Sequence, residues 1–337
     1  MPPSLLPRLI VGALTALLAS ATIGPTLPWS LAQLVKALWP LSSPLADRVQ
    51  QRAWHAWEAE VKDRVVPAES IEEVSIDSTP SLKNPFIIRG LLNGSSSMLA
   101  GDLEWLTRAP VGDLEVDYFS NASVEEGVVP NARGPLRDVV RRIASGGPEK
   151  IGTEMIFRKF PSLLAELMGD SADHVARILG GASHVAESRV GTLLTVPVFM
   201  ATGAERARTD LHSEPIGNLV LMLAGRKKWT LIDPDQSRYL RPTLSPDGRA
   251  YFLSSTPTVD PDHVLRHVRR RVFDAEHGDA IWVPTWTWHR VDYYPGVTAL
   301  SASLFHVRAD QMVQQNGLYS LLAMPNMVKE LIGWKTQ

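Results

Sequence analysis

The sequence predicts a mainly β fold, a barrel or double-sheet jelly roll, with flanking α-helices at both ends. The 25 prolines and 23 glycines indicate many turns and short elements, as in all-β domains. From residue 190 onward, short apolar runs such as NLVLMLAG, KKWTLIDP and VTALSASLFHV alternate with Gly, Pro and Asp turns, which is typical of strands. Apolar residues recur at helical spacing near both ends of the chain.

Residues 1–44 form a hydrophobic N-terminal segment that we set apart from the folded body. Residues 9–24 are an uncharged apolar run behind Arg8, slightly short of the ~20 residues that span a bilayer, although extension to Trp29 reaches that length. The small residues at 19–21 also fit a signal-peptide cleavage site. Three alternatives stay open: a membrane anchor, a cleaved secretory signal, or an ordinary helix packed on the body.

The rest of the chain divides into a helical linker, a main domain and a C-terminal helical segment. The linker, 45–67, has apolar residues at three- and four-residue spacing, so its helix is expected to dock on the domain. The main domain, 68–310, begins with NPFIIRGLL and LEVDYF as strands, followed by FPSLLAELMG as a helix that ends at Gly169. The last segment, 311–337, is expected to be helical.

Composition narrows the classes of partner and of site. A formal net charge of -2 gives no overall basic field, so no nucleic-acid partner is expected. The chain has no cysteine, which excludes disulfides, thiolate metal sites and a cysteine nucleophile. His, Asp and Glu are therefore the available strong metal ligands. A chain without thiols fits either redox compartment.

The strongest candidate site is a histidine and a carboxylate in TDLHSEPIGN, residues 209–218. In a strand, residues i and i+2 share a face, so His212 and Glu214 could both point into a barrel. His289, in the segment WVPTWTWHRV, offers a third ligand from another strand. Two histidines and one carboxylate form the facial triad of non-haem Fe(II) oxygenases, which leaves coordination positions open for co-substrate and dioxygen.

Further motifs accompany these three residues in a fixed order. Thr209 precedes the pair as T-x-x-H-x-E, Asn218 begins the apolar strand before GRKKWTLIDP, and GDAIWVPTWTWHRV follows later. This series resembles the JmjC and cupin-like family of Fe(II)- and 2-oxoglutarate-dependent oxygenases, particularly the branch that includes an asparaginyl hydroxylase. The resemblance covers roughly residues 70–308 and implies a double-stranded β-helix core, with NPFIIRGLL as its first strand.

The resemblance implies a role for each matching residue. Lys227 would pair with the distal carboxylate of the co-substrate 2-oxoglutarate, and Thr209 and Asn218 would hydrogen-bond to it. A dianionic keto acid in a narrow apolar barrel needs a buried cation and aligned donors, because an unpaired buried charge is costly. The ligands of Fe(II) would be His212, Glu214 and His289, with glutamate as a variant that the wider family accepts in place of aspartate.

Strand parity favours Lys227 over its neighbour as the inward residue. If KKWTLI is a strand, Lys227 shares a face with Trp229 and Leu231, whereas Lys228 shares the other face with Thr230. The first face is the more apolar, so it should point into the core. The alternative is that both lysines are solvated at the exit of a turn.

The sequence departs from the asparaginyl-hydroxylase pattern at two positions. That branch commonly has a tyrosine near the co-substrate on an earlier strand, and the corresponding segment here, EMIFRKF, offers only Phe157. That branch also has an asparagine on the strand after the second histidine, where this chain presents Ser301 or Ser303. Co-substrate binding would then be weaker or differently arranged, which leaves open a metal-binding relative without turnover.

Two other features of the sequence invite a functional interpretation. In WVPTWTWH we expect Trp282 in the core and Trp286 and Trp288 as walls of the site mouth, with ordinary barrel packing as the alternative. The basic run RHVRRRV, 266–272, could grip an acidic substrate, but we expect it to be a solvated insert between strands.

We therefore expect a 2-oxoglutarate-dependent dioxygenase that hydroxylates a protein or peptide side chain, or demethylates through hydroxylation, with O2 as co-substrate. Apart from the metal ligands, no protein acid or base need act. A small molecule or a lipid near a membrane is the second choice of substrate. The alternatives are a cupin-type metal enzyme that does not use 2-oxoglutarate, and a non-catalytic membrane-tethered binding protein on the same fold.

Localisation and assembly follow from the two ends of the chain. The N-terminal segment predicts a membrane-associated, secretory or organellar protein, with a cytoplasmic protein as the alternative. The C-terminal helical segment is a dimer face in some members of the resembling family, so a homodimer is a further expectation.

Overall fold

A computed structural model of the chain describes most of residues 51–331. The gaps are a few positions before residue 80, residue 241, and the segments 94–100, 122–129, 180–192, 204–206, 246–248 and 255–264. The predicted N-terminal hydrophobic segment lies outside the described residues, so its role as anchor or signal stays a prediction. Within the described part of the chain, no helix is both long and apolar enough to cross a membrane.

One of the two sheets of the core has seven strands, in the order β1-β14-β11-β16-β9-β13-β12. The short β1 pairs with β14 in parallel, and the other neighbours in this sheet are antiparallel. The bounds of its strands are β1 (Ala68–Glu69), β9 (Arg208–Ser213), β11 (Arg226–Ile232), β12 (Pro242–Leu244), β13 (Phe252–Ser254), β14 (Arg270–Glu276) and β16 (Trp288–Tyr293).

The other sheet has ten strands, in the order β2-β3-β15-β10-β17-β8-β6-β4-β5, with β7 beside β17. The bounds of its strands are β2 (Glu72–Glu73), β3 (Phe86–Ile88), β4 (Glu115–Phe119), β5 (Ala132–Pro135), β6 (Lys150–Thr153), β7 (Leu193–Thr195), β8 (Val198–Thr202), β10 (Gly217–Ala224), β15 (Ala280–Val283) and β17 (Thr298–His306).

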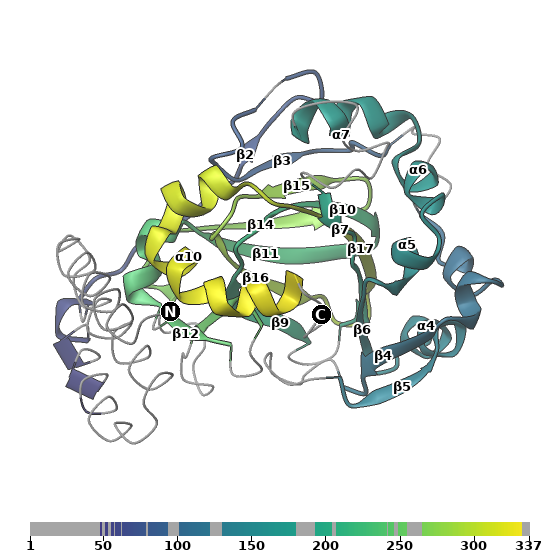
Figure 1. Ribbon diagram of the computed structural model, residues 1–337, viewed down its shortest axis with the longest axis horizontal. Coiled ribbons are helices and arrows are strands. Elements are labelled where there is room, and N and C mark those ends of the chain that lie inside the picture. Colours follow the sequence, from purple (N-terminus) through teal and green to yellow (C-terminus); the bar gives the residue numbers. More distant parts are fainter. Residues whose placement is uncertain are drawn as a thin grey trace, which may run out of the picture.

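Helices cover the outer faces of both sheets (Figure 1). In the described part of the chain, four α-helices pack on the ten-stranded sheet, and a long C-terminal helix with a non-helical residue at Asn316 crosses the seven-stranded sheet. The bounds of the helices are α4 (Leu136–Ala144), α5 (Met155–Lys159), α6 (Leu163–Met168), α7 (Ala172–Leu179) and α10 (Ala309–Leu331). Short 3-10 turns connect the elements at Glu104–Leu106, Val111–Asp113, Gly169–Ser171 and Pro234–Tyr239.

Alternation along the strands assigns each side chain to one of the layers. On β10, Leu219 and Leu221 join the outer cluster under the helices, whereas Val220 and Met222 join the cluster between the sheets. On β11, Trp229 lies in that same inner cluster, because successive residues of a strand point to opposite faces. The space between the two sheets is therefore apolar over much of its length.

The structure confirms the predicted fold class, a mainly β core with flanking helices at both ends. The described residues between 48 and 61 are helical, and Val61 is buried in the cluster beneath α10. The predicted strands in NPFIIRGLL and LEVDYF and the helix ending at Gly169 correspond to β3, β4 and α6.

The expectation of a solvated basic insert was wrong for the second half of RHVRRRV. Arg270 and Arg271 begin β14, a strand of the seven-stranded sheet that pairs with β11 and the edge strand β1. The Arg271 guanidinium donates to the Asp233 carboxylate, with Nη1 and Oδ1 2.6 Å apart. The density of charge in this run made a strand look like a solvated loop. Its arginines are instead paired with a carboxylate or hydrogen-bonded to backbone carbonyls.

Candidate metal centre

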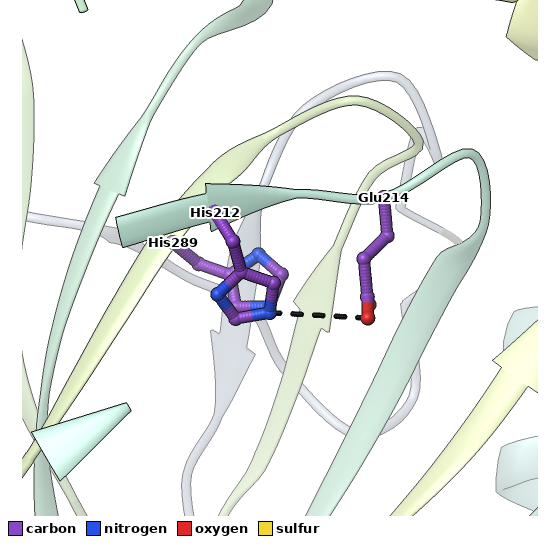
Figure 2. A group of neighbouring side chains, drawn as sticks. All are labelled: His212, Glu214 and His289. Atoms are coloured by element: carbon purple, nitrogen blue, oxygen red, sulfur yellow. Dashed lines mark ion pairs between the residues drawn. The ribbon is translucent and has the colours of Figure 1, made fainter. Parts of the chain in front are cut away.

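Two neighbouring strands of the seven-stranded sheet bring the predicted metal ligands together. β9 and β16 run antiparallel with His212 directly opposite His289, and Glu214 follows one residue after β9 ends. Figure 2 shows the two imidazoles side by side with the carboxylate turned toward them, and their ring centroids are 4.0 Å apart. The ligand atoms of the three residues all lie within 4.8 Å of one another. This cluster of two histidines and one carboxylate is compatible with metal binding.

Backbone carbonyls fix the orientation of both imidazole rings. His212 Nδ1 lies 2.8 Å from the carbonyl oxygen of Asp210, and His289 Nδ1 lies 3.1 Å from that of Thr287. A carbonyl can only accept, so each Nδ1 carries the proton and each Nε2 keeps its lone pair. His212 Nε2 is accordingly the atom that faces Glu214, 3.8 Å from Oε1. Such outer hydrogen bonds are how metal-ligating histidines are usually held.

Burial keeps His212 neutral at physiological pH. Loss of solvent around the ring, with a smaller contribution from the charge of Lys150, lowers the pKa of His212 from 6.5 to about 4. The hydrogen bond to Asp210 acts in the opposite direction but does not offset the burial. A neutral imidazole is the form that binds a metal ion, so protons compete with a metal for this ring only in acid.

The turn after the site is held by hydrogen bonds between its two segments. The backbone N–H of Trp286 donates to the carbonyl of Glu214 at 2.8 Å, and Ser213 Oγ donates to the carbonyl of Trp286 at 2.9 Å. Trp286 has a φ of 61°, which a bulky residue rarely adopts. The two hydrogen bonds hold this strained turn in place and so fix the backbone that presents the carboxylate.

The expectation that Trp286 and Trp288 form the site mouth was wrong, and the alternative of ordinary packing holds. Both side chains are fully buried on the outer face of the sheet, in the cluster that carries α10. Trp288 Nε1 donates to Ser237 Oγ at 2.8 Å, and Trp286 Nε1 donates to Ser320 Oγ at 3.0 Å. Trp288 cannot face the site, because it precedes the inward His289 by one residue.

A bulge explains how Thr209 and His212 share a face at odd spacing. His289 pairs with His212 and Val291 pairs with Thr209, so three steps on β9 match two on β16. Val291 belongs to the cluster between the sheets, and Thr209 opposite it points to the same side. The structure thus brings Thr209 to the inner face with the metal ligands, while its contact with a co-substrate stays a prediction.

Lys227 is buried in the space between the sheets, as strand parity predicts. Its side chain is 1% exposed, whereas Lys228 is exposed to solvent. Lys227 Nζ donates to Ser301 Oγ at 2.7 Å and to the Phe199 carbonyl at 3.4 Å, and lies 5.0 Å from the centre of the Tyr293 ring. These partners are all neutral, and burial lowers the pKa of Lys227 from 10.5 to about 7. Such a site favours an anionic ligand.

Asn218 faces the same interior from the opposite sheet. It pairs with Val283 and Phe305 in the ten-stranded sheet, and its side chain is buried. Its Oδ1 has no hydrogen-bond partner among the described residues. Because buried polar atoms are nearly always paired, this amide retains hydrogen-bonding capacity for a ligand.

The two positions at which the sequence departs from the asparaginyl-hydroxylase pattern lie in different parts of the structure. Phe157 lies on α5 in the outer cluster, 6.4 Å between ring centroids from Trp105, and is remote from the site. Ser301 is the hydrogen-bond partner of Lys227, and Ser303 is buried two residues further along the same inner face of β17.

A residue that sequence analysis missed stands near the site. Lys150, the first residue of β6, donates from Nζ to Thr209 Oγ1 at 3.0 Å. These two residues are 59 positions apart, and no motif links them. Only the pairing of β6 with β8, which places this short strand beside the core of the sheet, reveals the contact.

Comparison with known proteins agrees with this architecture. The sequence matches the cupin-like domain family over residues 46–310. The chain belongs to the cupin-like domain family. The match includes the two strands that carry the candidate ligand histidines, both sheets and the helices α4–α7, so the predicted membership of the cupin-like family is confirmed.

Curated relatives cover a smaller part of the chain. HSPB1-associated protein 1 of Bos taurus is 30% identical over 117 residues, which are 33% of this chain and 24% of the relative. The human protein of the same name is 29% identical over 117 residues, with the same coverage. A homologue from Danio rerio is 32% identical over 101 residues, 28% of this chain and 22% of the relative. The chain thus spans about a quarter of the length of the relatives it matches.

Proposed function

We propose that this cupin-like protein is an Fe(II)- and 2-oxoglutarate-dependent oxygenase. The observation that carries the proposal is the burial of Lys227 among neutral partners, on the inner face of the sheet that also carries the candidate metal ligands. A metal enzyme without an anionic co-substrate has no need for a buried cation there. The imidazoles and the carboxylate are the donor set expected for a non-haem iron centre with open positions.

The chain would supply binding, orientation and exclusion of water. Lys227 and Ser301 offer donors to a carboxylate at one end of the interior, and Asn218 offers an amide on the facing sheet. Apolar side chains between the sheets, Trp229 and Val291 among them, keep bulk water from the reacting atoms. When bound, Fe(II) and 2-oxoglutarate supply oxidative decarboxylation to succinate and CO2, coupled to insertion of one oxygen atom of O2 into a C–H bond.

The substrate class follows from the family and is part of the proposal. We propose a protein or peptide side chain as the acceptor of the hydroxyl group, with N-demethylation as the same chemistry on an N-methyl carbon. Neither reaction requires an acid or a base from the protein, so Thr209, His212 and Glu214 need only bind the co-substrate and the metal.

The test is an anaerobic titration of the full chain with Fe(II) and 2-oxoglutarate, following the metal-to-ligand absorption band. The band should appear in the wild type, disappear in His212→Ala and weaken strongly in Lys227→Met, whereas the matched surface variant Lys228→Met should keep it. A folded, iron-loaded wild type without the band would contradict the use of 2-oxoglutarate. If Lys227→Met left both the band and product formation unchanged, a metal enzyme with a different co-substrate would replace the proposal.

A further inference from the structure

A second lysine reaches the same interior from the opposite sheet. On β6, Ile151 packs in the outer cluster under the helices, so Lys150 points to the inner side. Lys150 lies across from Ala201 of β8, and Ala201 packs against Tyr293, the ring beneath the Lys227 ammonium. The two lysines therefore enter the space between the sheets from opposite sides.

The Lys150 ammonium contacts the β9 strand at the residue expected to bind the co-substrate. Its Nζ is 3.0 Å from Thr209 Oγ1 and 3.4 Å from the carbonyl of Arg208. It also lies 5.7 Å from the centre of the Phe119 ring, a further contact that orients the ammonium. Because Thr209 Oγ1 accepts from the lysine, its own hydroxyl proton remains for donation to a ligand.

The charges of the two lysines interact across this space. After burial, the second cause of the lowered pKa of Lys227 is the positive charge of Lys150. Like charges brought together in a poorly solvated region repel one another, and an anion placed between them reverses that cost. Among the described residues, the contacts recorded for Lys227 are with neutral groups, the Ser301 hydroxyl and the Phe199 carbonyl among them.

We propose that Lys150 and Lys227 together bind the distal carboxylate of 2-oxoglutarate, with the Thr209 hydroxyl as a third donor. The inference rests on the proposed function and deepens it, because it adds a second cation to the binding of the co-substrate. Lys150 acts as a positioning and specificity residue: it favours 2-oxo acids with a second carboxylate over those with only one. A charged donor is also worth more than a neutral hydroxyl in a buried site.

The test separates recognition of the distal carboxylate from general integrity of the site. The full chain is loaded with Mn(II), and binding is followed by calorimetry with 2-oxoglutarate and with 2-oxobutyrate, a 2-oxo acid that lacks the distal carboxylate. Lys150→Met keeps the length of the apolar stem, Lys150→Arg keeps the charge, and Lys228→Met is the exposed control. Circular dichroism and thermal unfolding verify that each variant is folded.

For Lys150→Met we expect the Kd of 2-oxoglutarate to rise by about 10–100-fold, and the Kd of 2-oxobutyrate to change by less than about twofold. Lys150→Arg should recover most of the loss, and Lys228→Met should match the wild type.

Two results would overturn the inference while leaving the proposed function intact, and a third would overturn both. If Lys150→Met bound 2-oxoglutarate like the wild type while Lys227→Met lost it, the co-substrate would stand and the second lysine would fall. Equal weakening toward both ligands would assign Lys150 a structural role only. A wild type that binds neither acid would remove the co-substrate itself, and the inference with it.

Discussion

The two faces of the seven-stranded sheet are built from alternate residues of the same strands, and both are largely apolar, but they differ in the buried polar groups that they carry. The inner face holds His212, His289 and the buried Lys227, three polar groups that cost stability when taken out of water. Helix α10 crosses this sheet (Figure 1), and Trp288 and its neighbours on the outer face pack against it. We therefore expect substitutions on the inner face to change ligand binding, and substitutions on the outer face to change stability alone.

The largest effect should come from the inner face at the metal cluster. His289→Ala removes one of two imidazoles that stand 4.0 Å apart between ring centroids, and we expect it to abolish binding of Fe(II) or Mn(II) in calorimetric titrations. Thermal unfolding of the metal-free variant should stay close to that of the wild type. The matched control is His277→Ala, an exposed histidine, which should bind metal normally. Retained metal affinity in His289→Ala would remove this residue from the proposed site.

Trp288→Ala tests the outer face with the next largest effect. The side chain is fully buried and donates from Nε1 to Ser237. Its ring meets the Tyr319 ring edge to face, with the ring centroids 6.2 Å apart. Its loss should lower the free energy of unfolding by about 3–5 kcal/mol, measured by urea denaturation. Metal affinity of the fraction that stays folded should be retained, although His289 is the next residue. If the folded fraction of Trp288→Ala bound metal more weakly than the wild type, the separation between the two faces would be wrong.

The third prediction is that the inner face is more stable without its lysine. Lys227→Met should raise the free energy of unfolding of the ligand-free protein by about 1–4 kcal/mol at pH 7, because it removes a buried ammonium. The same variant should lose 2-oxoglutarate, so stability and binding should change in opposite directions. A destabilised Lys227→Met would mean that the hydrogen bonds to Ser301 and Phe199 outweigh the cost of burial.

The pH dependence of that difference follows from the lowered pKa of Lys227. Between pH 7 and 10.5 the unfolded chain holds a proton that the native lysine has released, so wild-type stability rises with pH across this window. The advantage of Lys227→Met should therefore be complete below pH 7 and vanish as the pH approaches 10.5. Affinity for 2-oxoglutarate should fall as pH rises above about 7, because the anion needs the charged lysine.

Sequence motifs and parity predicted the polar residues of the inner face, but not how the strands deliver them. The spacing of His212 and Glu214, and the apolar partners of Lys227, are local signals that survive in the fold. The bulge that turns Thr209 inward and the approach of Lys150 depend on pairing between distant strands, which no local pattern encodes. The predicted position of Trp286 at the site mouth was wrong for a related reason, because the direction of its side chain depends on its own left-handed backbone conformation in a turn.

The smallest effect should come from Lys228, the neighbour of the buried lysine. Lys228 lies on the same strand as Lys227 and has the same type of side chain with the same charge, but it is exposed on the other face of β11. We expect Lys228→Met to change the free energy of unfolding by no more than about 0.5 kcal/mol and to leave 2-oxoglutarate binding unaltered. Since the pair differs only in which side of the sheet it faces, a loss of binding in Lys228→Met would show that lysine charge acts at long range. An unaltered Lys228→Met beside a defective Lys227→Met would assign the effect to burial and position alone.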